Sequence, residues 1–537
     1  MRNANVHEKI NFIQSVTNDC LRGVYKPHEY KNIILPMILI KRFADCEMKN
    51  GFNDLTKNKE DIKINFEKLL NNFPDEVREV INLFDFNSNI SKMDKANVLY
   101  LLIEKFNSKQ AYFGEDEVSV FEMGYIFEHL LGKFMNNFEP TGEHFTPNDV
   151  TLLLSEILLH DFKNTTRSVS CYDMTMGTSQ MLCSFKNEAE KRYKNIKVNC
   201  YGQELNPETY AIAKASALIS RRDSDKLYCA NTLSDDKLKD FKFDFIISNP
   251  PYGVSWKLEK NAVIKDDRFK VGLPNIGDGQ MLFILNGLSK LKDEGKMAII
   301  HSGSVLFSGS ADSGESKIRR YLIENDLLDS VIKLPKSLFF NTEIETYVLV
   351  ITKNKPEEKK GKIRLIDASK SFVKRKKPIG KKRVDIDEKT RSDIIYAYDK
   401  KHGEIKFECQ DTSKVIKSKH FDNVDFGFYK ITVERPKRDE YGNILYKKGK
   451  MIADSELRDT EIVPLTQTIE EYMAREVLPY APDAWVDETK TKIGYEIPFT
   501  RHFYEYVPPR PSQEILTEIM ASEEKMKTLL KELLCHE

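Results

Sequence analysis

The segment from Asp244 to Tyr252, Asp-Phe-Ile-Ile-Ser-Asn-Pro-Pro-Tyr, contains residue types that could hold a planar amine. Its apolar run indicates the end of a buried parallel strand, and the two prolines stop the strand and stiffen the turn. Asn249 is therefore expected at the carboxyl end of a strand, where open α/β sheets bind ligands. The Asn249 side-chain oxygen and the Pro250 carbonyl would accept two N–H bonds, Pro251 would keep the turn rigid, and Tyr252 would offer an aromatic face.

An amine attached to a purine or a carbonyl is a poor nucleophile because its lone pair is delocalised. Accepting both N–H bonds would localise that lone pair and aim it at an electrophile, so positioning and aligned dipoles would supply most of the catalysis. This chemistry needs no metal, covalent nucleophile or strong base, and we predict no metal site. The alternative is a strand that ends in a proline turn, with Tyr252 as a packing residue.

A second set of residues follows other predicted strands and suits a nucleotide-like cofactor. The turn Asp173–Gln180 follows the first strand, and Gly177 allows a sharp bend close to a ligand. The second strand, Lys197–Gln203, ends at Glu204, which is placed to accept both hydroxyls of a ribose. Asn231 follows the third strand and could address an adenine ring.

The segment Gly142–Val150 joins a helical region to these strands. Pro147 suits the first turn of a helix capped by Thr146. That arrangement would leave Phe145 and nearby backbone groups free to clamp a cofactor. Capping by itself would also explain the Thr-Pro pair.

The elements that must position these residues change in kind near residue 140. Apolar residues at helical spacing predict helices over Asn32–Phe43, Lys95–Phe106 and Asp116–Phe138. Downstream, helices such as Pro207–Ser220 and Gln280–Lys292 alternate with seven predicted strands: Ser168–Tyr172, Lys197–Gln203, Leu227–Cys229, Phe243–Ser248, Met297–His301, Leu328–Leu334 and Thr346–Thr352. This alternation predicts an α/β fold with a doubly wound, mostly parallel, Rossmann-like sheet.

We therefore expect three domains: a helical domain over 1–140, a sheet domain over 141–425, and a carboxyl-terminal extension over 426–537. Lys374–Arg383 holds seven basic residues in ten. A solvated linker and a phosphate-contacting loop both remain open for it. Ser512 would cap a terminal helix whose apolar stripe must be covered by its own chain or by a partner subunit.

Bulk composition narrows the class of protein. The 537 residues carry 83 basic and 83 acidic side chains, so nucleic-acid contact requires a local patch. The eight cysteines include no Cys-x-x-Cys pair, which indicates reduced core residues in a cytoplasmic protein. The first residues lack the apolar core of a signal peptide, and the longest apolar run, Ile33–Ile40, is too short to span a membrane.

The order of glycine turn, second-strand acid and Asn-Pro-Pro-Tyr resembles that of S-adenosylmethionine-dependent amino-methyltransferases. With Gly142–Pro147, the resemblance extends over nearly the whole chain to the modification (M) subunits of type I restriction–modification systems, which are N6-adenine DNA methyltransferases. Similar blocks occur at Leu35–Arg42, Ile318–Glu324, Lys333–Phe340, Leu457–Pro464 and Gly494–Tyr504. The last two are the most specific, since generic methyltransferases lack them.

The resemblance implies roles for particular residues. The target adenine, rotated out of the duplex, would be held by the catalytic set Asn249, Pro250, Pro251 and Tyr252. The cofactor would be S-adenosylmethionine, bound by His144, Phe145, Thr146, Pro147, Asn148, Asp149, Asp173, Thr175, Met176, Gly177, Glu204 and Asn231. Double-stranded DNA would be the substrate. The family usually assembles two M subunits with one specificity (S) subunit, and a restriction (R) subunit joins the full complex.

Two departures from the family pattern keep other functions open. Met174 stands where the cofactor turn usually has proline, and Ser179 replaces its second glycine. One alternative is therefore an assembly subunit that has lost cofactor binding. Another is a methyltransferase acting on a protein amide or an RNA base, because those groups present a similar planar NH2.

Overall fold

The computed structural model describes residues 2–48, 52–136, 146–163, 168–399, 403–409, 412–504, 506 and 509–534. Residues 1–497 form one compact unit and residues 498–537 a second. The predicted division into three domains stays a prediction.

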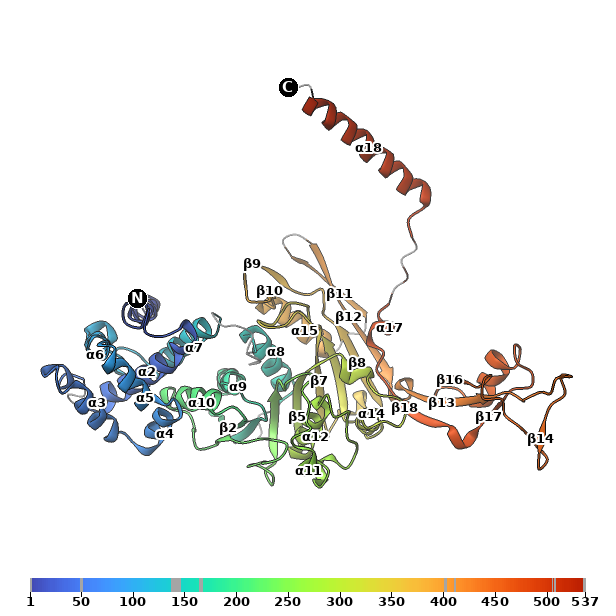
Figure 1. Ribbon diagram of the computed structural model, residues 1–537, viewed down its shortest axis with the longest axis horizontal. Coiled ribbons are helices and arrows are strands. Elements are labelled where there is room, and N and C mark those ends of the chain that lie inside the picture. The colour runs from blue at the N-terminus through green and yellow to red at the C-terminus, as the bar shows by residue number, and fades with distance from the viewer. Residues whose placement is uncertain are drawn as a thin grey trace. The chain divides into compact units, whose positions relative to one another are not determined.

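A ten-stranded mixed sheet forms the centre of the larger unit (Figure 1), in the order β11-β12-β8-β6-β7-β5-β4-β1-β2-β3. Its strands are β1 (Ser168–Asp173), β2 (Lys197–Glu204), β3 (Leu227–Cys229), β4 (Phe243–Ser248), β5 (Leu291–Ser302), β6 (Leu328–Lys333), β7 (Thr346–Thr352), β8 (Lys362–Asp367), β11 (Gly403–Cys409) and β12 (Thr412–Asp422). The seven predicted strands are all confirmed. Three strands at one end of the sheet, β8, β12 and β11, were not predicted.

The strand directions confirm the predicted doubly wound, mostly parallel fold and refine it. Strands β1 to β5 pair in parallel, as do β6 and β8. Strand β7 lies between β5 and β6 and is antiparallel to both, while β12 and β11 add an antiparallel edge. Every residue of β7 is buried, which accounts for its continuous apolar sequence.

Helices flank this sheet and connect its strands. They are α8 (Asn148–Leu159), α9 (Gln180–Arg192), α10 (Pro207–Ile219), α11 (Lys260–Val263), α12 (Gln280–Lys290), α13 (Ser304–Phe307), α14 (Gly314–Glu324) and α15 (Glu388–Asp399). The start of α10 is encoded locally: Asn206 caps it, accepting from the amides of Glu208 and Thr209, and Pro207 takes the first helical position.

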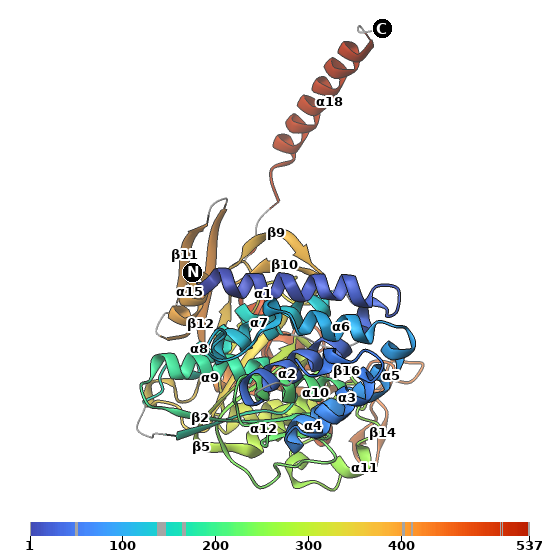
Figure 2. The ribbon, with the colours of Figure 1, turned by 90° about the vertical axis from the view of Figure 1, so that its left-hand side faces the viewer.

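The amino-terminal region is helical, as predicted. Its longer helices are α1 (Arg2–Val16), α2 (Lys31–Glu47), α3 (Ile62–Asn71), α4 (Asp75–Leu83), α5 (Phe86–Lys95), α6 (Leu99–Phe106) and α7 (Val120–Asn136). Helix α10 of the sheet region lies beside α2, α4 and α7 (Figures 1 and 2). Buried α10 residues, including Ile212, belong to the same hydrophobic cluster as these helices. The helical region therefore shares its core with the sheet region.

The basic segment that the sequence left open is an ordered hairpin, so the linker interpretation is wrong. Strand β9 (Val373–Ile379) pairs with β10 (Lys382–Asp385) in antiparallel fashion, and Gly380 turns between them with φ +55°. A left-handed residue at this point is what a tight hairpin needs.

Beyond residue 426 the larger unit ends in a small antiparallel sheet. It contains β13 (Gly427–Glu434), β16 (Asp459–Pro464), β17 (Trp485–Val486) and β18 (Lys492–Tyr495), with a separate hairpin of β14 (Tyr446–Lys447) and β15 (Lys450–Met451) and the short helix α16 (Ile469–Tyr472). The second unit holds α17 (Phe499–His502) and α18 (Ser512–Leu534), which confirms the predicted terminal helix.

Two further expectations concern the cysteines and membrane-spanning helices. Six cysteines in the described part of the chain are free: Cys20, Cys171 and Cys183 are buried, Cys46 and Cys200 are half-buried, and Cys229 is exposed. Among the described helices, none combines the length and apolar character that crossing a bilayer requires.

Truncation of Ile212 tests the shared core. Ile212 is fully buried, so Ile212→Ala should lower the free energy of unfolding by about 2–5 kcal/mol. Urea unfolding followed by circular dichroism would measure it. The control is Ile64→Ala, a half-exposed isoleucine of α3, which should change stability by less than about 0.5 kcal/mol. Independent unfolding of the helical region and the sheet in Ile212→Ala would contradict a common core.

Candidate active site

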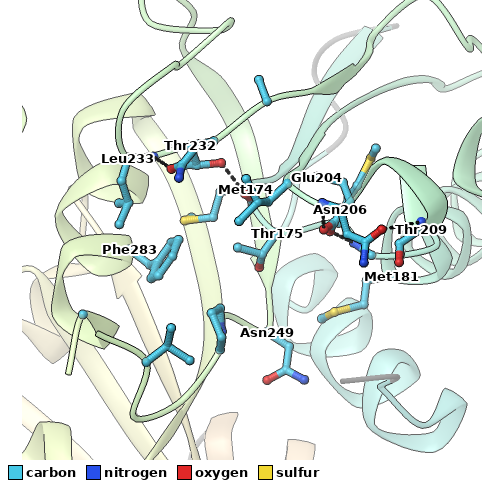
Figure 3. Close-up of a pocket in the computed structure, with 18 of the residues that line it drawn as sticks. Met174, Thr175, Met181, Glu204, Asn206, Thr209, Thr232, Leu233, Asn249 and Phe283 are labelled. Carbon is cyan, nitrogen blue, oxygen red and sulfur yellow. Dashed lines mark hydrogen bonds between the residues drawn. The ribbon is translucent and has the colours of Figure 1, made fainter. Parts of the chain in front are cut away.

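A cavity of about 610 Å³ opens at the carboxyl ends of β1, β2, β3 and β4 (Figure 3). Eight residues predicted from the sequence line it: Thr146, Thr175, Met176, Gly177, Glu204, Asn231, Asn249 and Pro251. The proposed amine-binding and cofactor-binding residues are thus brought to one cavity, although the sequence separates the first from the last by more than a hundred positions.

Glu204 connects the turn after β1 to the start of α10. Its Oε2 accepts from the Gly177 amide at 2.9 Å, and its Oε1 accepts from the Asn206 amide at 2.8 Å. Gly177 has φ +54°, a backbone conformation that glycine adopts without strain. The carboxylate is consequently fixed at the cavity wall by two separate backbone segments.

A second glycine makes room for the turn that follows β1, Asp173–Gln180. Gly202 lies in β2, and a Cβ added there would come within 2.3 Å of the Met176 sulfur. The Met176 amide also donates to the Gln203 carbonyl at 2.9 Å. Close packing of the turn on β2 therefore depends on the missing side chain at position 202.

Asp173 supports the same turn from below. It is fully buried, and its Oδ1 accepts from the Thr175 amide at 3.0 Å and from the Ser248 hydroxyl at 2.6 Å. Burial raises the pKa of Asp173 to about 7 despite these hydrogen bonds, which act in the opposite direction. The carboxyl therefore exchanges a proton near neutral pH.

The third strand tip is held by a network around Arg268. Asn231 donates to Glu259 Oε1 at 2.9 Å and accepts from the Leu233 amide at 2.9 Å. The Arg268 guanidinium donates to the carbonyls of Thr232 and Leu233 at 3.0 and 3.2 Å. It also pairs with two carboxylates, Asp236 and Asp266. These contacts fix the loop that follows β3 along one wall of the cavity.

Asn249 is buried at the end of β4, and both ends of its amide are engaged. Its Nδ2 donates to Thr146 Oγ1 at 2.9 Å, and its Oδ1 accepts from the Tyr252 hydroxyl. Both partners are hydroxyl groups, and together they hold the amide in place. The second places a hydroxyl donor at the oxygen that an incoming N–H group would use. Burial also raises the pKa of Tyr252, so this hydroxyl keeps its proton.

Other predicted residues lie elsewhere. Pro147, Asn148, Asp149, Asp173, Pro250 and Tyr252 are not among the residues that line the cavity. His144 and Phe145 lie outside the described residues. Asp149 instead accepts from Lys382 Nζ at 2.9 Å and from the Ile386 amide at 2.8 Å.

The capping expectation for Thr146 is wrong. Helix α8 begins at Asn148, Pro147 takes the capping position, and no side chain caps it. The Thr146 hydroxyl accepts from Asn249 instead, because the folded chain brings the end of β4 against this segment.

Beyond Met176 and Pro251, the apolar part of the cavity was not predicted. Met174, Leu205, Leu233, Val254, Trp256 and Phe283 supply most of it. Phe283 comes from α12, and no local pattern connects that helix to the cofactor turn. Asn206 also lines the cavity, and its helix-capping sequence Asn-Pro-Glu-Thr could have indicated it.

Ser179, which replaces a family glycine, is not among the cavity-lining residues. It is buried, has φ +61°, and its hydroxyl lies 3.7 Å from the Cys183 sulfur in the first turn of α9. Met174 does line the cavity, beside Thr175 in Figure 3. Of the two departures, only Met174 changes the cavity wall.

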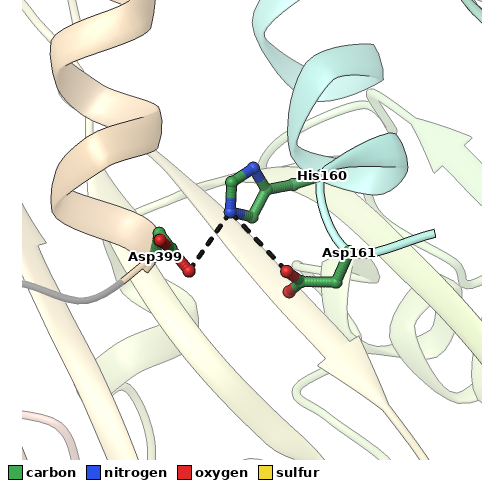
Figure 4. Close-up of side chains that lie close together, drawn as sticks. All are labelled: His160, Asp161 and Asp399. Carbon is green, nitrogen blue, oxygen red and sulfur yellow. Dashed lines mark ion pairs between the residues drawn. The ribbon is translucent and has the colours of Figure 1, made fainter. Parts of the chain in front are cut away.

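A separate polar cluster lies away from this cavity (Figure 4). His160 Nε2 is 3.3 Å from Asp399 and 3.6 Å from Asp161. Asp161 is also within 4 Å of two lysines, Lys296 at 3.9 Å and Lys359 at 3.8 Å. Because two ammonium groups lie near Asp161 and His160 lies near both carboxylates, the cluster is best described as an ion-pair network between the end of α8, α15 and β5.

Comparison with known proteins identifies the family. The N-6 DNA methylase family matches residues 119–440, and the HsdM N-terminal domain matches residues 10–51. The chain belongs to the N-6 DNA methylase family, which confirms the predicted resemblance.

Individual relatives agree with this assignment. The chain is 31% identical to the type I restriction enzyme MpnII methylase subunit of Mycoplasma pneumoniae over 54% of this chain and 55% of that protein. It is 25% identical to the MjaVIII methylase subunit of Methanocaldococcus jannaschii over 82% of each. The chain spans about half the length of most of the curated relatives it matches.

A solved structure shares the fold. The type I restriction–modification methyltransferase subunit from Streptococcus thermophilus has a TM-score of 0.54 and 24% identity. The match covers 73% of this chain and 93% of that one.

The pKa of Asp173 predicts a pH-dependent stability. Its folded-state pKa of about 7 lies above the ordinary value of 3.8, so the unfolded chain loses this proton first as pH rises. The stabilisation that the raised pKa of Asp173 adds to the free energy of unfolding is complete below about pH 4 and is lost by about pH 7. Asp173→Asn keeps an oxygen for Ser248 and Thr175 but does not ionise. Its free energy of unfolding should therefore fall less steeply than the parent's between pH 4 and 7 in urea titrations.

Asp244→Asn serves as the control with opposite sign. Burial raises the pKa of Asp244, but hydrogen bonds from Lys292 and Ser170 outweigh burial and lower it overall. The stabilisation that the lowered pKa of Asp244 adds to the folded state is present above the ordinary pKa of the carboxyl and is lost only in acid. That variant should run parallel to the parent above about pH 5. Identical pH slopes for Asp173→Asn and the parent would show that Asp173 does not titrate in this window.

Proposed function

We propose that this chain is the modification subunit of a type I restriction–modification system. It transfers a methyl group from S-adenosylmethionine to the N6 amine of an adenine in double-stranded DNA. One observation carries the proposal: Asn249 of the Asn-Pro-Pro-Tyr turn lines the same cavity as Gly177 and Glu204, in a member of the N-6 DNA methylase family.

The residues present fit S-adenosylmethionine. A cavity of about 610 Å³ falls within the usual 300–1,000 Å³ of small-molecule sites. Glu204 would accept from the ribose hydroxyls, Asn231 would bind the adenine ring, and apolar side chains such as Leu233 and Phe283 would cover its faces. When bound, this group supplies a methyl on a positively charged sulfur, which is the electrophile for an amine.

The chain's own residues prepare the target amine. The Asn249 oxygen and the Pro250 carbonyl would accept its two N–H bonds, and Tyr252 would stack on the base. Asn249 Oδ1 accepts from the Tyr252 hydroxyl and, as an amide oxygen with two lone pairs, can accept a second bond from the amine. Thr146 would hold the Asn249 side chain in place, because its hydroxyl bonds to the other end of the same amide. Rotating a base out of the duplex costs a few kcal/mol, which stacking and these hydrogen bonds offset.

A partner subunit is the best explanation for α18. In this helix Ile515, Leu516, Ile519, Met520, Met526, Leu529 and Leu530 are each 37–62% exposed. Large apolar residues repeated along one helix favour burial against another helix. We assign this stripe to the specificity subunit, which would carry sequence recognition, and the restriction subunit would join the same complex.

Methylation of mixed-sequence DNA, with and without a co-expressed specificity subunit, tests the proposed function. We expect N6-methyladenine as the product. Asn249→Ala should lower turnover by at least about 100-fold, as loss of one transition-state hydrogen-bonding group commonly does. Its affinity for S-adenosylmethionine should stay within about twofold in calorimetry, since Glu204 and Gly177 remain.

Asn249→Asp is the matched variant. It keeps an acceptor oxygen at the same position and should retain more turnover than Asn249→Ala. Methylated RNA or protein in place of DNA would indicate the alternative acceptors. The absence of any heat with millimolar S-adenosylmethionine would indicate an assembly subunit. Full activity of Asn249→Ala would refute the catalytic role.

The helix assignment is tested by placing charge on α18. Ile519→Lys with Leu530→Lys inserts two charges into the apolar stripe and should abolish co-purification with the specificity subunit. Thr517→Lys with Thr528→Lys inserts the same charges, equally spaced, on the opposite side of the helix and should leave the complex intact. Loss of the complex in both variants, or in neither, would argue against this interface.

A further inference from the structure

The β9–β10 hairpin contains two kinds of cation. Arg375 Nη1 lies 2.6 and 2.7 Å from the two oxygens of Asp385, and Lys382 is buried against Asp149. In contrast, four lysines are exposed, and the structure records no ion pair for them within the described ranges: Lys374, Lys376, Lys377 and Lys381. Buried Lys382 and half-buried Arg375 stabilise the hairpin, whereas no carboxylate among the described residues pairs with the four exposed lysines.

The hairpin is held firmly rather than tethered loosely. The Lys381 amide donates to the Phe340 carbonyl at 2.7 Å, and the Arg383 amide donates to the Ser337 carbonyl at 2.8 Å. Lys382 Nζ also donates to the Leu338 carbonyl at 3.0 Å. The backbone that carries the exposed lysines is therefore held in place, so no ordering of the hairpin backbone would be needed to use them together.

The same chain segment holds the hairpin and the amine site. Thr146 accepts from Asn249, and Asp149, three residues later, pairs with Lys382 at 2.9 Å. Val384 of β10 belongs to the hydrophobic cluster against which Tyr252 packs. The exposed lysines are thus mechanically connected to the turn that would receive the adenine.

We propose that the exposed lysines of β9–β10 bind the phosphate backbone of DNA beside the rotated adenine. This inference rests on the proposed function, which supplies duplex DNA as the substrate. The chain has equal numbers of basic and acidic residues, so affinity for a polyanion must come from a local excess of charge. Four unpaired lysines on a rigid hairpin next to the amine site provide such an excess.

The test neutralises three of these lysines in the full chain, with the specificity subunit co-expressed. Lys376→Ala, Lys377→Ala and Lys381→Ala together spare the structural cations Arg375 and Lys382. Binding of mixed-sequence duplex DNA is followed by fluorescence anisotropy over a range of salt. The slope of log affinity against log salt should become shallower by about 2 to 3, because each phosphate contact contributes about 0.9.

Catalytic measurements separate this effect from the chemistry. The KM for DNA should rise, while kcat at saturating DNA and affinity for S-adenosylmethionine should not change. The control replaces three exposed lysines of the amino-terminal helical region, Lys68, Lys95 and Lys109, with alanine. It should keep the parental salt slope.

Each other outcome overturns the inference in a recognisable way. If the parent methylates DNA and the hairpin variant shows the same salt slope and KM, the inference fails while the proposed function stands. If the hairpin variant loses the specificity subunit but not intrinsic DNA affinity, the lysines face a protein partner instead. If the parent neither binds nor methylates DNA, both the proposed function and the inference fail.

Discussion

The arrangement of this protein depends on the meeting of several parallel strands at one edge of a sheet. Where β1, β2 and β4 end, Gly177, Glu204 and Asn249 reach one cavity, and hydrogen bonds hold each of them in place. A parallel sheet brings the carboxyl ends of its strands together without any specific contact between them. The chemistry therefore needs only short loops with the right residues, and the buried sheet supplies the precision.

Polar groups at this edge are bonded both to backbone groups and to other side chains. Glu204 accepts hydrogen bonds from two backbone amides. Arg268 donates to the carbonyls of Thr232 and Leu233 in the loop after β3. Such contacts fix loop conformation because a buried charge left without its partner costs several kcal/mol. Asp173 is the exception, since burial there favours the protonated carboxyl over an ion.

The regions outside the sheet are also held by specific contacts with the sheet region. The amino-terminal helices share a core with α10, whose other side covers the sheet that carries the cavity. The β9–β10 hairpin is joined through Asp149 to the segment that also contacts Asn249. Neither region contributes a described residue to the lining of the cavity, so each supports it only through these contacts.

Local patterns determined much of this protein. Apolar runs bounded by breakers gave seven strands, and the residues after them gave the glycine turn, the acid and the Asn-Pro-Pro-Tyr turn, because these signals lie within a few residues of each other. The resemblance carried by those motifs identified the family. Strands β8, β11 and β12 were missed because their sequences mix charged and apolar residues and lack a continuous apolar run.

Only the tertiary structure decided the partners of the predicted residues. Thr146 accepts from Asn249 across 103 positions, and Asp149 pairs with Lys382 across 233. No local pattern encodes such pairs, since a threonine that caps a helix and one that contacts a distant asparagine look alike in sequence. The antiparallel direction of β7 and the contribution of Phe283 to the cavity have the same origin. The direction of β7 and the position of Phe283 depend on how buried surfaces pack in three dimensions. The sequence specifies which residues are apolar enough to be buried and where the chain can turn.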